Sequence, residues 1–329
     1  MCTGLTLSTK DGHHLFGRSM DIPFGFNQGV HIVPRNYIWT NHVTSESMKT
    51  KHAILGMSSI IDNHPMFADG MNEKGLTCAG LYFANFAEYE KKSINGKFNI
   101  GPYDFILWTL SNFENLEELK EGLKNLNLVD EPFSPAVPIP LLHWICSDKS
   151  GKSIVIEKVK NKLNIFDNPV GVLTNSPDFK WHLYNLHQYI GINPMQPKDL
   201  KWGDLDLFPF GQGLGAFGIP GDFTPASRFV KASFLKNHIS DIDNEVNGVA
   251  GFFHILSSCD IPRGTVLSTE GHKDTTIYTA AMCSESGTYY YHTYSNRQIT
   301  AINLFKEDLD MDKIKSYPYR ETQSLFCEN

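Results

Sequence analysis

The sequence has no apolar run long enough to cross a membrane and no excess of positive charge. Its apolar runs, such as residues 105–108, fall far short of the roughly 20 residues that span a bilayer. Its 29 lysines and arginines against 36 aspartates and glutamates give a formal net charge of −7. Nucleic acids and anionic membranes attract a basic surface. We therefore expect neither a nucleic-acid partner nor a membrane partner.

Cysteine is sparse, and the familiar metal and redox motifs are missing. None of the six cysteines forms a C-x-x-C pair, and no H-E-x-x-H occurs among the 13 histidines. Residues 1–10 lack both the positive and the apolar segment of an export signal. These absences predict a cytoplasmic protein with reduced thiols and with no metal or other cofactor.

Other catalytic signatures are absent or misplaced. The sequence contains no G-x-S-x-G of a serine hydrolase and no papain-like cysteine motif. Residues 213–218 match G-x-G-x-x-G, but Pro209 precedes them and Pro220 follows them. A dinucleotide site needs a strand before these glycines and a helix after them, and Pro220 prevents the helix. We expect a glycine-rich structural loop here.

The chain does have a hydrophobic content of 41%, which allows a sizeable core, and alternating blocks of strand and helix patterns. Strands are predicted at residues 3–9, 14–19, 29–34, 51–60, 75–86, 141–147, 153–159, 162–166, 171–174, 275–282, 287–294 and 298–304. Helices are predicted at residues 115–128, 178–190, 226–239 and 245–257. This order favours an α+β fold in which helices cover packed antiparallel sheets, in a single domain over residues 1–329.

Cys2 is set apart from the other cysteines by its position alone. The simple interpretation is a small residue that opens an edge strand. The chemical interpretation is that Met1 is removed and leaves Cys2 with a free α-amine, whose pKa near 7.7–8.0 suits a base at neutral pH. Such a site also needs a cation to favour the thiolate, a carboxylate to hold the amine, and donors for an oxyanion.

Seven ordered segments decide between these interpretations. They are MCT (1–3), FGRSMD (16–21), PRNY (34–37), NEKGL (72–76), VLTNSP (172–177), IPGD (219–222) and SRFV (227–230). Together they resemble the choloylglycine hydrolase family, which holds bile salt hydrolases and penicillin V acylases. The resemblance runs from residue 1 to about residue 305. It implies an N-terminal-nucleophile hydrolase with an αββα sandwich, two antiparallel sheets between helical layers.

The resemblance also implies a role for each catalytic residue. Cys2 is the nucleophile, and its freed amine is the base. Arg18 stabilises the thiolate, and Asp21 orients the amine. Asn175 donates its side-chain amide to the oxyanion, and Arg228 completes the charged network. No metal or cofactor takes part.

The expected substrate class depends on Tyr82. In this family its backbone N–H is the second oxyanion donor, and bile salt hydrolases usually have Asn at this place, whereas penicillin V acylases have Tyr. The chain therefore resembles the acylase type, with a phenoxyacetyl amide as substrate. The alternatives are a conjugated bile salt hydrolase that releases glycine or taurine, and a hydrolase of N-acyl-homoserine lactones or other acyl amides. A silent binding protein is the alternative if Met1 stays attached.

An apolar cleft must hold the acyl group of this small-molecule substrate. Candidates come from three loops rich in apolar residues, although each could equally be ordinary core: Met20, Ile22, Phe24, Phe26, Ile60, Ile61, Met66, Phe67, Phe133, Val137 and Ile139.

Residues 195–224 resemble the inter-subunit extension of the family, which implies a homotetramer. Phe208, Phe210 and Phe217 in this segment would need a partner surface.

Overall fold

Two antiparallel sheets lie face to face in the middle of the molecule. The structure is a computed structural model, and it describes residues 1–160 and 162–329. The first sheet has seven strands, in the order β14-β1-β2-β18-β19-β20 with β17 paired to β18. Its strands are β1 (Cys2–Ser8), β2 (His14–Ile22), β14 (Val172–Leu173), β17 (Val266–Leu267), β18 (Lys273–Cys283), β19 (Thr288–Thr293) and β20 (Thr300–Asn303).

The second sheet has eight strands, in the order β13-β12-β11-β8-β7-β6-β3-β21. Its strands are β3 (Gly29–Val33), β6 (Ile54–Ile61), β7 (His64–Asn72), β8 (Thr77–Tyr82), β11 (Leu142–Ser147), β12 (Ser153–Val159), β13 (Lys162–Asp167) and β21 (Lys315–Tyr317). One apolar cluster joins residues of both sheets, including Leu55, Leu81 and Ile145 from this one.

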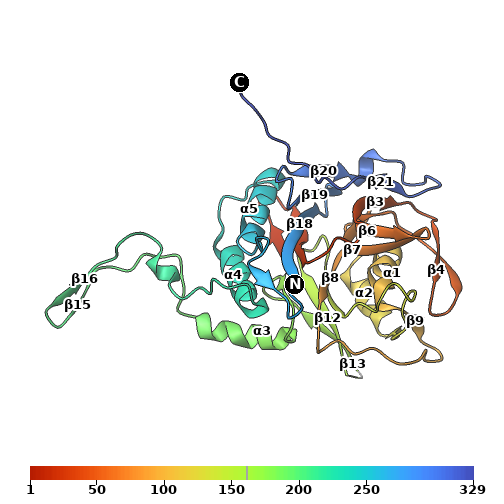
Figure 1. The fold of residues 1–329 in the computed structure, drawn as a ribbon, viewed down its shortest axis with the longest axis horizontal. Coiled ribbons are helices and arrows are strands. Elements are labelled where there is room, and N and C mark those ends of the chain that lie inside the picture. Colours follow the sequence, from red (N-terminus) through yellow and green to blue (C-terminus); the bar gives the residue numbers. More distant parts are fainter. Residues whose placement is uncertain (161) are drawn as a thin grey trace.

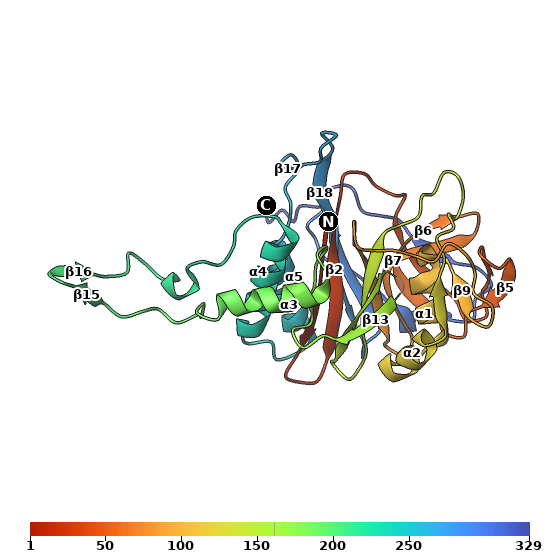
Figure 2. The same ribbon diagram turned by 90° about the horizontal axis from the view of Figure 1, so that it is seen from below.

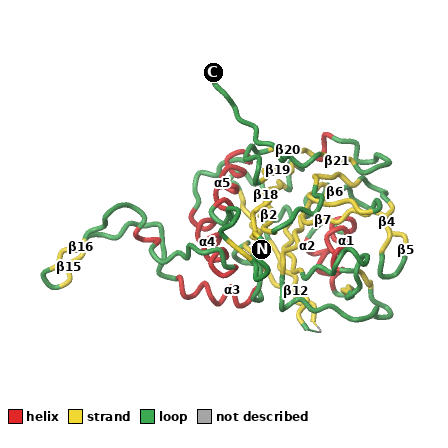
Figure 3. Tube along the Cα trace, viewed as in Figure 1, coloured by secondary structure: helices red, strands yellow, loops and turns green. Residues whose placement is uncertain are grey.

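Helices cover the outer face of each sheet (Figures 1 and 3). They are α1 (Phe105–Asn112), α2 (Leu116–Leu123), α3 (Phe179–Leu186), α4 (Pro225–His238) and α5 (Glu245–Ser257). Helices α4 and α5 pack on β1 and its neighbours, whereas α1 packs on β7 and β8. The central strands are thus buried on both faces, which explains why β1 and β2 are buried almost throughout. These layers confirm the predicted α+β class.

A long arm leaves the body between α3 and α4 and carries a two-stranded hairpin at its tip (Figures 1 and 2). The hairpin pairs β15 (Leu200–Trp202) with β16 (Leu205–Leu207). The predicted glycine-rich loop follows it: Gly213 has a φ of +98°, which glycine tolerates, and a short 3-10 turn at Leu214–Ala216 replaces the helix of a nucleotide site.

One predicted helix is too long, and two long elements were not predicted. The helix predicted at residues 115–128 ends at Leu123, and β10 (Leu126–Leu128) follows it because those residues pair in parallel with β9 (Phe98–Ile100). Strand β7 and helix α1 were not predicted. The pattern of β7 is broken by polar residues such as Asp69, and α1 is apolar all round because almost all of it is buried.

Smaller elements complete the chain. They are the hairpin of β4 (Ile38–Asn41) and β5 (Glu46–Lys49), and the 3-10 helices η1 (Pro102–Asp104), η2 (His187–Tyr189), η3 (Leu214–Ala216) and η4 (Leu304–Lys306). None of the helices in the two described ranges combines the length and the hydropathy needed to cross a membrane.

Gly17 allows β2 and β18 to approach closely, so we expect Gly17→Ala to destabilise the fold. A Cβ at this position would lie 2.0 Å from the backbone oxygen of Ala280, and backbone cannot rotate away. Overpacking of this kind costs about 1–3 kcal/mol. The measurement is the urea midpoint of unfolding. Gly211→Ala is the control, because its added Cβ meets nothing within 4 Å. Equal midpoints for the two variants would contradict the prediction.

Candidate active site

Cys2 lies at the start of β1, between β14 and β2 in the first sheet, with its side chain only 2% exposed. It pairs with Met20 of β2, and Gly4 pairs with Arg18. Because side chains alternate across a strand, Cys2, Arg18 and Met20 share the face that points at the second sheet. There Arg18 Nη2 donates a hydrogen bond to Cys2 Sγ. A cation in this position favours the thiolate.

The guanidinium of Arg18 is fully buried and held from both sheets. Its Nε donates to Ser19 O at 2.9 Å, and its Nη1 donates to Gly80 O of the second sheet at 2.9 Å. Burial alone would lower the pKa of Arg18, but neighbouring groups, Cys2 first among them, raise the pKa above its ordinary value. The side chain therefore stays charged beside the thiol.

Asn175 follows β14 and is oriented by two donors. Its Oδ1 accepts from Cys2 N at 2.8 Å and from Arg228 Nη2 at 2.7 Å. These bonds fix which end of the amide is which. Its Nδ2 donates to Tyr82 O at 2.8 Å, and a side-chain amide nitrogen carries two hydrogens. One N–H of Asn175 therefore remains to meet an oxyanion.

The strand register shows where the Tyr82 N–H points. Phe83 N donates to Leu141 O at 2.8 Å, so by the antiparallel alternation the backbone groups of Tyr82 face away from β11. The Tyr82 carbonyl meets Asn175 on that side, and the N–H of the same residue points the same way. Two oxyanion donors, Asn175 Nδ2 and Tyr82 N, thus lie on one side of the site.

Arg228 ties the site to helix α4. The helix begins at Pro225 after the N-cap Thr224, which places Arg228 in its first turn, and the guanidinium is fully buried. Its Nη1 donates to Cys2 O and lies 3.9 Å from Asp21 Oδ2. Contacts therefore link all six residues that the sequence nominated.

Asp21 does not contact the Cys2 nitrogen in a chain that carries Met1. Its Oδ1 accepts from Thr276 Oγ1 at 2.6 Å, while the partner of Cys2 N is Asn175 Oδ1. Met1 precedes Cys2 and pairs with the backbone of Asp21: its N-terminus donates to Asp21 O, and its own carbonyl accepts from Asp21 N at 2.9 Å. As a peptide nitrogen, Cys2 N has a single hydrogen, which it donates to Asn175 Oδ1. After removal of Met1, the α-amine of Cys2 would have further N–H groups that could donate to the Asp21 carboxylate.

Two buried histidines lie against the backbone of Thr174 and Asn175, and the sequence analysis did not assign them to the site. His182 Nε2 lies 2.8 Å from Asn175 O, and its ring stacks on Phe229. His143 Nε2 lies 3.0 Å from Thr174 O. The only sequence signal for His182 was a polar residue three positions after Phe179, on the buried face of α3.

An apolar cavity of about 350 Å³ opens beside the guanidinium of Arg18. Six of the predicted substrate residues line it: Met20, Phe26, Ile61, Met66, Phe67 and Val137. Gly80 and Ala68 also line it, and the carbonyls of both accept hydrogen bonds from Arg18 Nη1. The cavity therefore borders the backbone that holds Arg18, and Met20, the strand partner of Cys2, lines it. Its lining from η1 and α1, namely Pro102, Tyr103 and Ile106, was not predicted, because neither element was.

Five predicted substrate residues do not line this cavity. Ile60 lies on the opposite face of β6 from Ile61, since side chains alternate along a strand. Phe24 is exposed and contacts His272, and Phe133 is buried against His42 and His64. The other two, Ile22 and Ile139, pack against the apolar cores.

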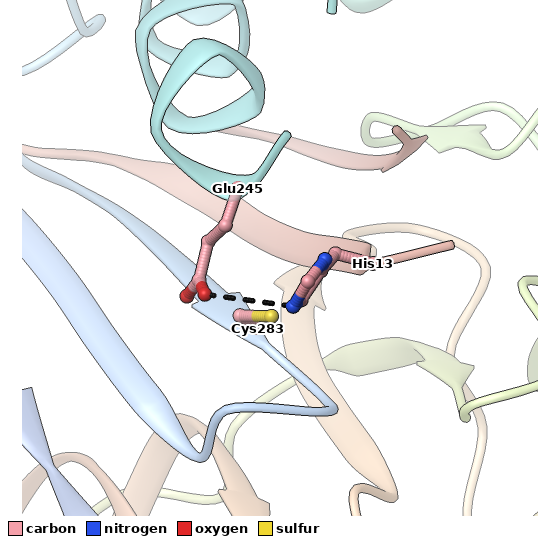
Figure 4. A group of neighbouring side chains, drawn as sticks. All are labelled: His13, Glu245 and Cys283. Atoms are coloured by element: carbon pink, nitrogen blue, oxygen red, sulfur yellow. Dashed lines mark ion pairs between the residues drawn. The ribbon is translucent and has the colours of Figure 1, made fainter. Parts of the chain in front are cut away.

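One other group of described side chains could hold a metal ion: His13, Glu245 and Cys283, with ligand atoms within 4.8 Å of one another (Figure 4). All three already have partners: Asp11 Oδ1 lies 2.9 Å from His13 Nδ1, Tyr290 Oη donates to Glu245 at 2.9 Å, and Cys283 Sγ donates to Glu285 at 3.6 Å. The group lies at the end of β18 away from Cys2, so it is not part of this site.

We expect His182→Gln to reduce the loss of stability on acidification. Burial lowers the pKa of His182 to about 4, whereas an unfolded histidine has a pKa near 6.5. The unfolded chain therefore binds a proton first, and folding stability falls by about 3 kcal/mol as the pH drops from 6.5 to 4. Glutamine can keep the bond to Asn175 O without titrating.

The measurement is the urea midpoint at about pH 7 and about pH 4.5. His254→Gln is the control, because His254 is exposed. An identical acid loss in His182→Gln and in the parent would contradict the role of His182.

Several proteins similar to this chain are named as bile salt hydrolases. The bile salt hydrolase/transferase of Clostridium perfringens is 52% identical over 325 residues, 99% of each chain. That of Lactiplantibacillus plantarum is 39% identical over 329 residues, the whole of both chains. The crystal structure of the C2A mutant of conjugated bile acid hydrolase from C. perfringens matches with a TM-score of 0.95 and 51% identity over both full chains.

Penicillin V acylase from Agrobacterium tumefaciens has the same fold. Its structure matches with a TM-score of 0.77 and 22% identity, covering 96% of this chain and 91% of that one. The family model of linear amide C–N hydrolases, choloylglycine hydrolase family, matches residues 2–317. The predicted family and its N-terminal-nucleophile sandwich are confirmed. The chain belongs to the choloylglycine hydrolase family and is an amidohydrolase that acts on linear amides.

Proposed function

We propose that the chain hydrolyses conjugated bile salts, releasing glycine or taurine from the steroid acyl group. The observation that carries this proposal is the 52% identity, over nearly the whole chain, to a relative named bile salt hydrolase/transferase. The likeness to penicillin V acylase, at 22% identity, speaks for the fold alone. The comparisons thus favour the alternative over the acylase preference that Tyr82 suggests.

The cavity supports a bulky apolar acyl group. Its volume of about 350 Å³ lies in the range of small-molecule sites, and its lining is mostly aliphatic and aromatic. The Tyr82 side chain is 48% exposed beside Asn175, so it is free to contact either a steroid or a phenoxyacetyl ring. The tyrosine is therefore compatible with both substrates, and the 52% identity to a bile salt hydrolase/transferase favours the bile salt.

The site geometry supports the following mechanism, which begins once Met1 is removed. Cys2 Sγ attacks the amide carbon, and the α-amine takes the thiol proton. Asn175 Nδ2 and Tyr82 N donate to the oxyanion. The α-amine passes its proton to the leaving nitrogen as the C–N bond breaks, which leaves a thioester on Cys2. The nearby charges of Arg18, Arg228 and Asp21 are buried and need no solvent reorganisation during this step.

Water then resolves the thioester. The α-amine takes a proton from the water, the C–S bond breaks, and the thiol of Cys2 is restored. An amine could attack the same thioester instead, which would transfer the acyl group. The names of the C. perfringens and L. plantarum relatives include both outcomes.

We also propose that the whole chain is one catalytic domain. The N-terminal strands β1 and β2 and the C-terminal strands β18 to β20 share one sheet, and β21 near the C-terminus pairs with β3 of the other. Residues 195–224 are the exception, because they stand away from both sheets (Figure 2).

We propose that this arm assembles a homotetramer. It exposes large apolar side chains that neither sheet covers: Met195, Leu200, Trp202, Leu205, Phe208, Phe210 and Phe217. Such a concentration of exposed apolar side chains is typical of an interaction surface.

We propose a cytoplasmic location as well. The six cysteines are free, and Cys78 and Cys146 have sulfur atoms 3.2 Å apart without a bond between them. Neighbouring free thiols suit a reducing compartment.

The function is tested by measuring kcat/KM on glycocholate, taurocholate, penicillin V and a long-chain N-acyl-homoserine lactone side by side. We expect the two bile salts to be the preferred substrates. Intact mass should show the loss of Met1. Asn175→Ala should lower kcat by about 10²–10³, the usual cost of one oxyanion donor, and should remain folded.

Cys2→Ala is the control for background hydrolysis and should be inactive. A higher kcat/KM on penicillin V or on the lactone would overturn the bile salt proposal. Activity in Cys2→Ala would overturn the mechanism.

The assembly is tested by light scattering on the purified chain. We expect a tetramer, and Phe210→Ser should shift the mass towards smaller species because Phe210 is fully exposed in the single chain. Ile38→Ser, at an exposed apolar residue of β4, is the matched control and should leave the mass unchanged. A parent chain that is monomeric would contradict the proposal.

A further inference from the structure

A buried carboxylate joins the two sheets beneath the active site. Asp69 lies in β7 of the second sheet and is fully buried. Its Oδ2 accepts from Tyr278 Oη at 2.5 Å, and its Oδ1 accepts from Tyr289 Oη at 2.7 Å. Both tyrosines belong to the first sheet and are themselves fully buried. No part of the hydrolytic mechanism above uses these three residues.

Two β-bulges bring these groups together. In β7 the register shifts so that Ala68 is an extra residue, and Phe67 then packs outwards while Asp69 points at the first sheet. In β18 the extra residue is Ile277. It lets Thr276 reach Asp21 on the helix side while Tyr278 reaches Asp69 on the inner side. A regular strand would place residues two apart on the same face.

Each carboxyl oxygen of Asp69 accepts one tyrosine hydroxyl, which is the pattern of an ionised carboxylate because that group has no proton to donate. Burial raises the pKa of the Asp69 carboxyl above its ordinary value, and the charge of Arg18 and the two hydroxyls offset part of that rise. Burial also raises the pKa of both tyrosines well above the ordinary value, so they remain protonated donors.

Arg18 lies against the same strand. Its Nη1 contacts Ala68 O, the residue before Asp69, at 3.4 Å. A buried guanidinium needs a buried opposite charge, because an unpaired one is strongly destabilising. The titratable groups that face Asp69 are few: Arg18 from β2, Tyr278 from β18, Tyr289 from β19 and Cys78 from β8. Arg18 is the cation among them.

We propose that Asp69 is a positioning residue, a buried opposite charge near the Arg18 guanidinium that weakens the effect of this cation on the Cys2 thiol. This inference rests on the proposed role of Cys2 as the nucleophile. With Asp69 in place, the positive charge of Arg18 is shared between a carboxylate on one side and a sulfur on the other. Without Asp69, less of that charge is balanced, and its effect on the sulfur increases.

The test is Asp69→Asn, which keeps the shape and removes the charge. The measurement is the rate of Cys2 alkylation by iodoacetamide against pH, read as the mass of the N-terminal peptide. We expect the midpoint of this profile to move to lower pH by about one unit, the usual effect of one close charge. Asp167→Asn removes an exposed carboxylate and should leave the midpoint unchanged. An unchanged midpoint in a folded Asp69→Asn protein would overturn the proposal.

A double-mutant cycle tests whether Asp69 acts through Arg18. In an Arg18→Gln background, Asp69→Asn should no longer move the midpoint. The same shift in that background would overturn the positioning role. Asp69→Glu keeps the charge and should stay near the parent profile, which a merely structural role would not predict.

A further variant keeps the test possible if Asp69→Asn does not fold. Asp69→Leu combined with Tyr278→Phe and Tyr289→Phe replaces the whole network by apolar groups, a change that buried charges often tolerate. It should show the same acid shift. Alkylation needs no turnover, so a chain that ignores bile salts but shows the shift refutes the proposed substrate and keeps this inference.

Discussion

The rest of the active site depends on a buried guanidinium beside a buried sulfur. Arg18 donates to Cys2 Sγ from between the two sheets, where water does not reach it. A charge in such a place must be held by fixed groups, and the carbonyls of Ser19 and Gly80 hold it from both sheets. The position of Arg18 beside the Cys2 sulfur therefore depends on how closely the two sheets pack.

The active-site residues of the first sheet lie on both of its faces. The inner face carries Cys2 and Arg18, where the thiol meets the cavity side of the molecule. The helix face carries Asp21, which lies near Arg228 of α4. The backbone of Cys2 connects the two, because its N–H meets Asn175 and its carbonyl meets Arg228. The Cys2 sulfur on the inner face and the charges of Asp21 and Arg228 on the helix face therefore lie on opposite sides of the sheet, and the Cys2 backbone links them.

Met1 shows how the site is organised before it is complete. Cys2 N already meets Asn175 Oδ1, and Asn175 Nδ2 already meets Tyr82 O. Loss of Met1 would turn this peptide nitrogen into an amine that already lies beside Asn175. A site arranged in advance in this way loses little free energy to reorganisation during the reaction.

The sequence by itself determined the family, the six linked residues and the α+β layering, because ordered motifs and alternating apolar patterns are local features. It missed β7 and α1, and with them Asp69 and the cavity residue Ile106, since polar residues break the first pattern and complete burial removes the periodicity of the second. It could not show that Asn175 rather than Asp21 meets Cys2 N, or that Ile60 faces away from the cavity. These depend on register and on bulges such as Ala68 and Ile277, which arise only when strands far apart in the chain pair with one another.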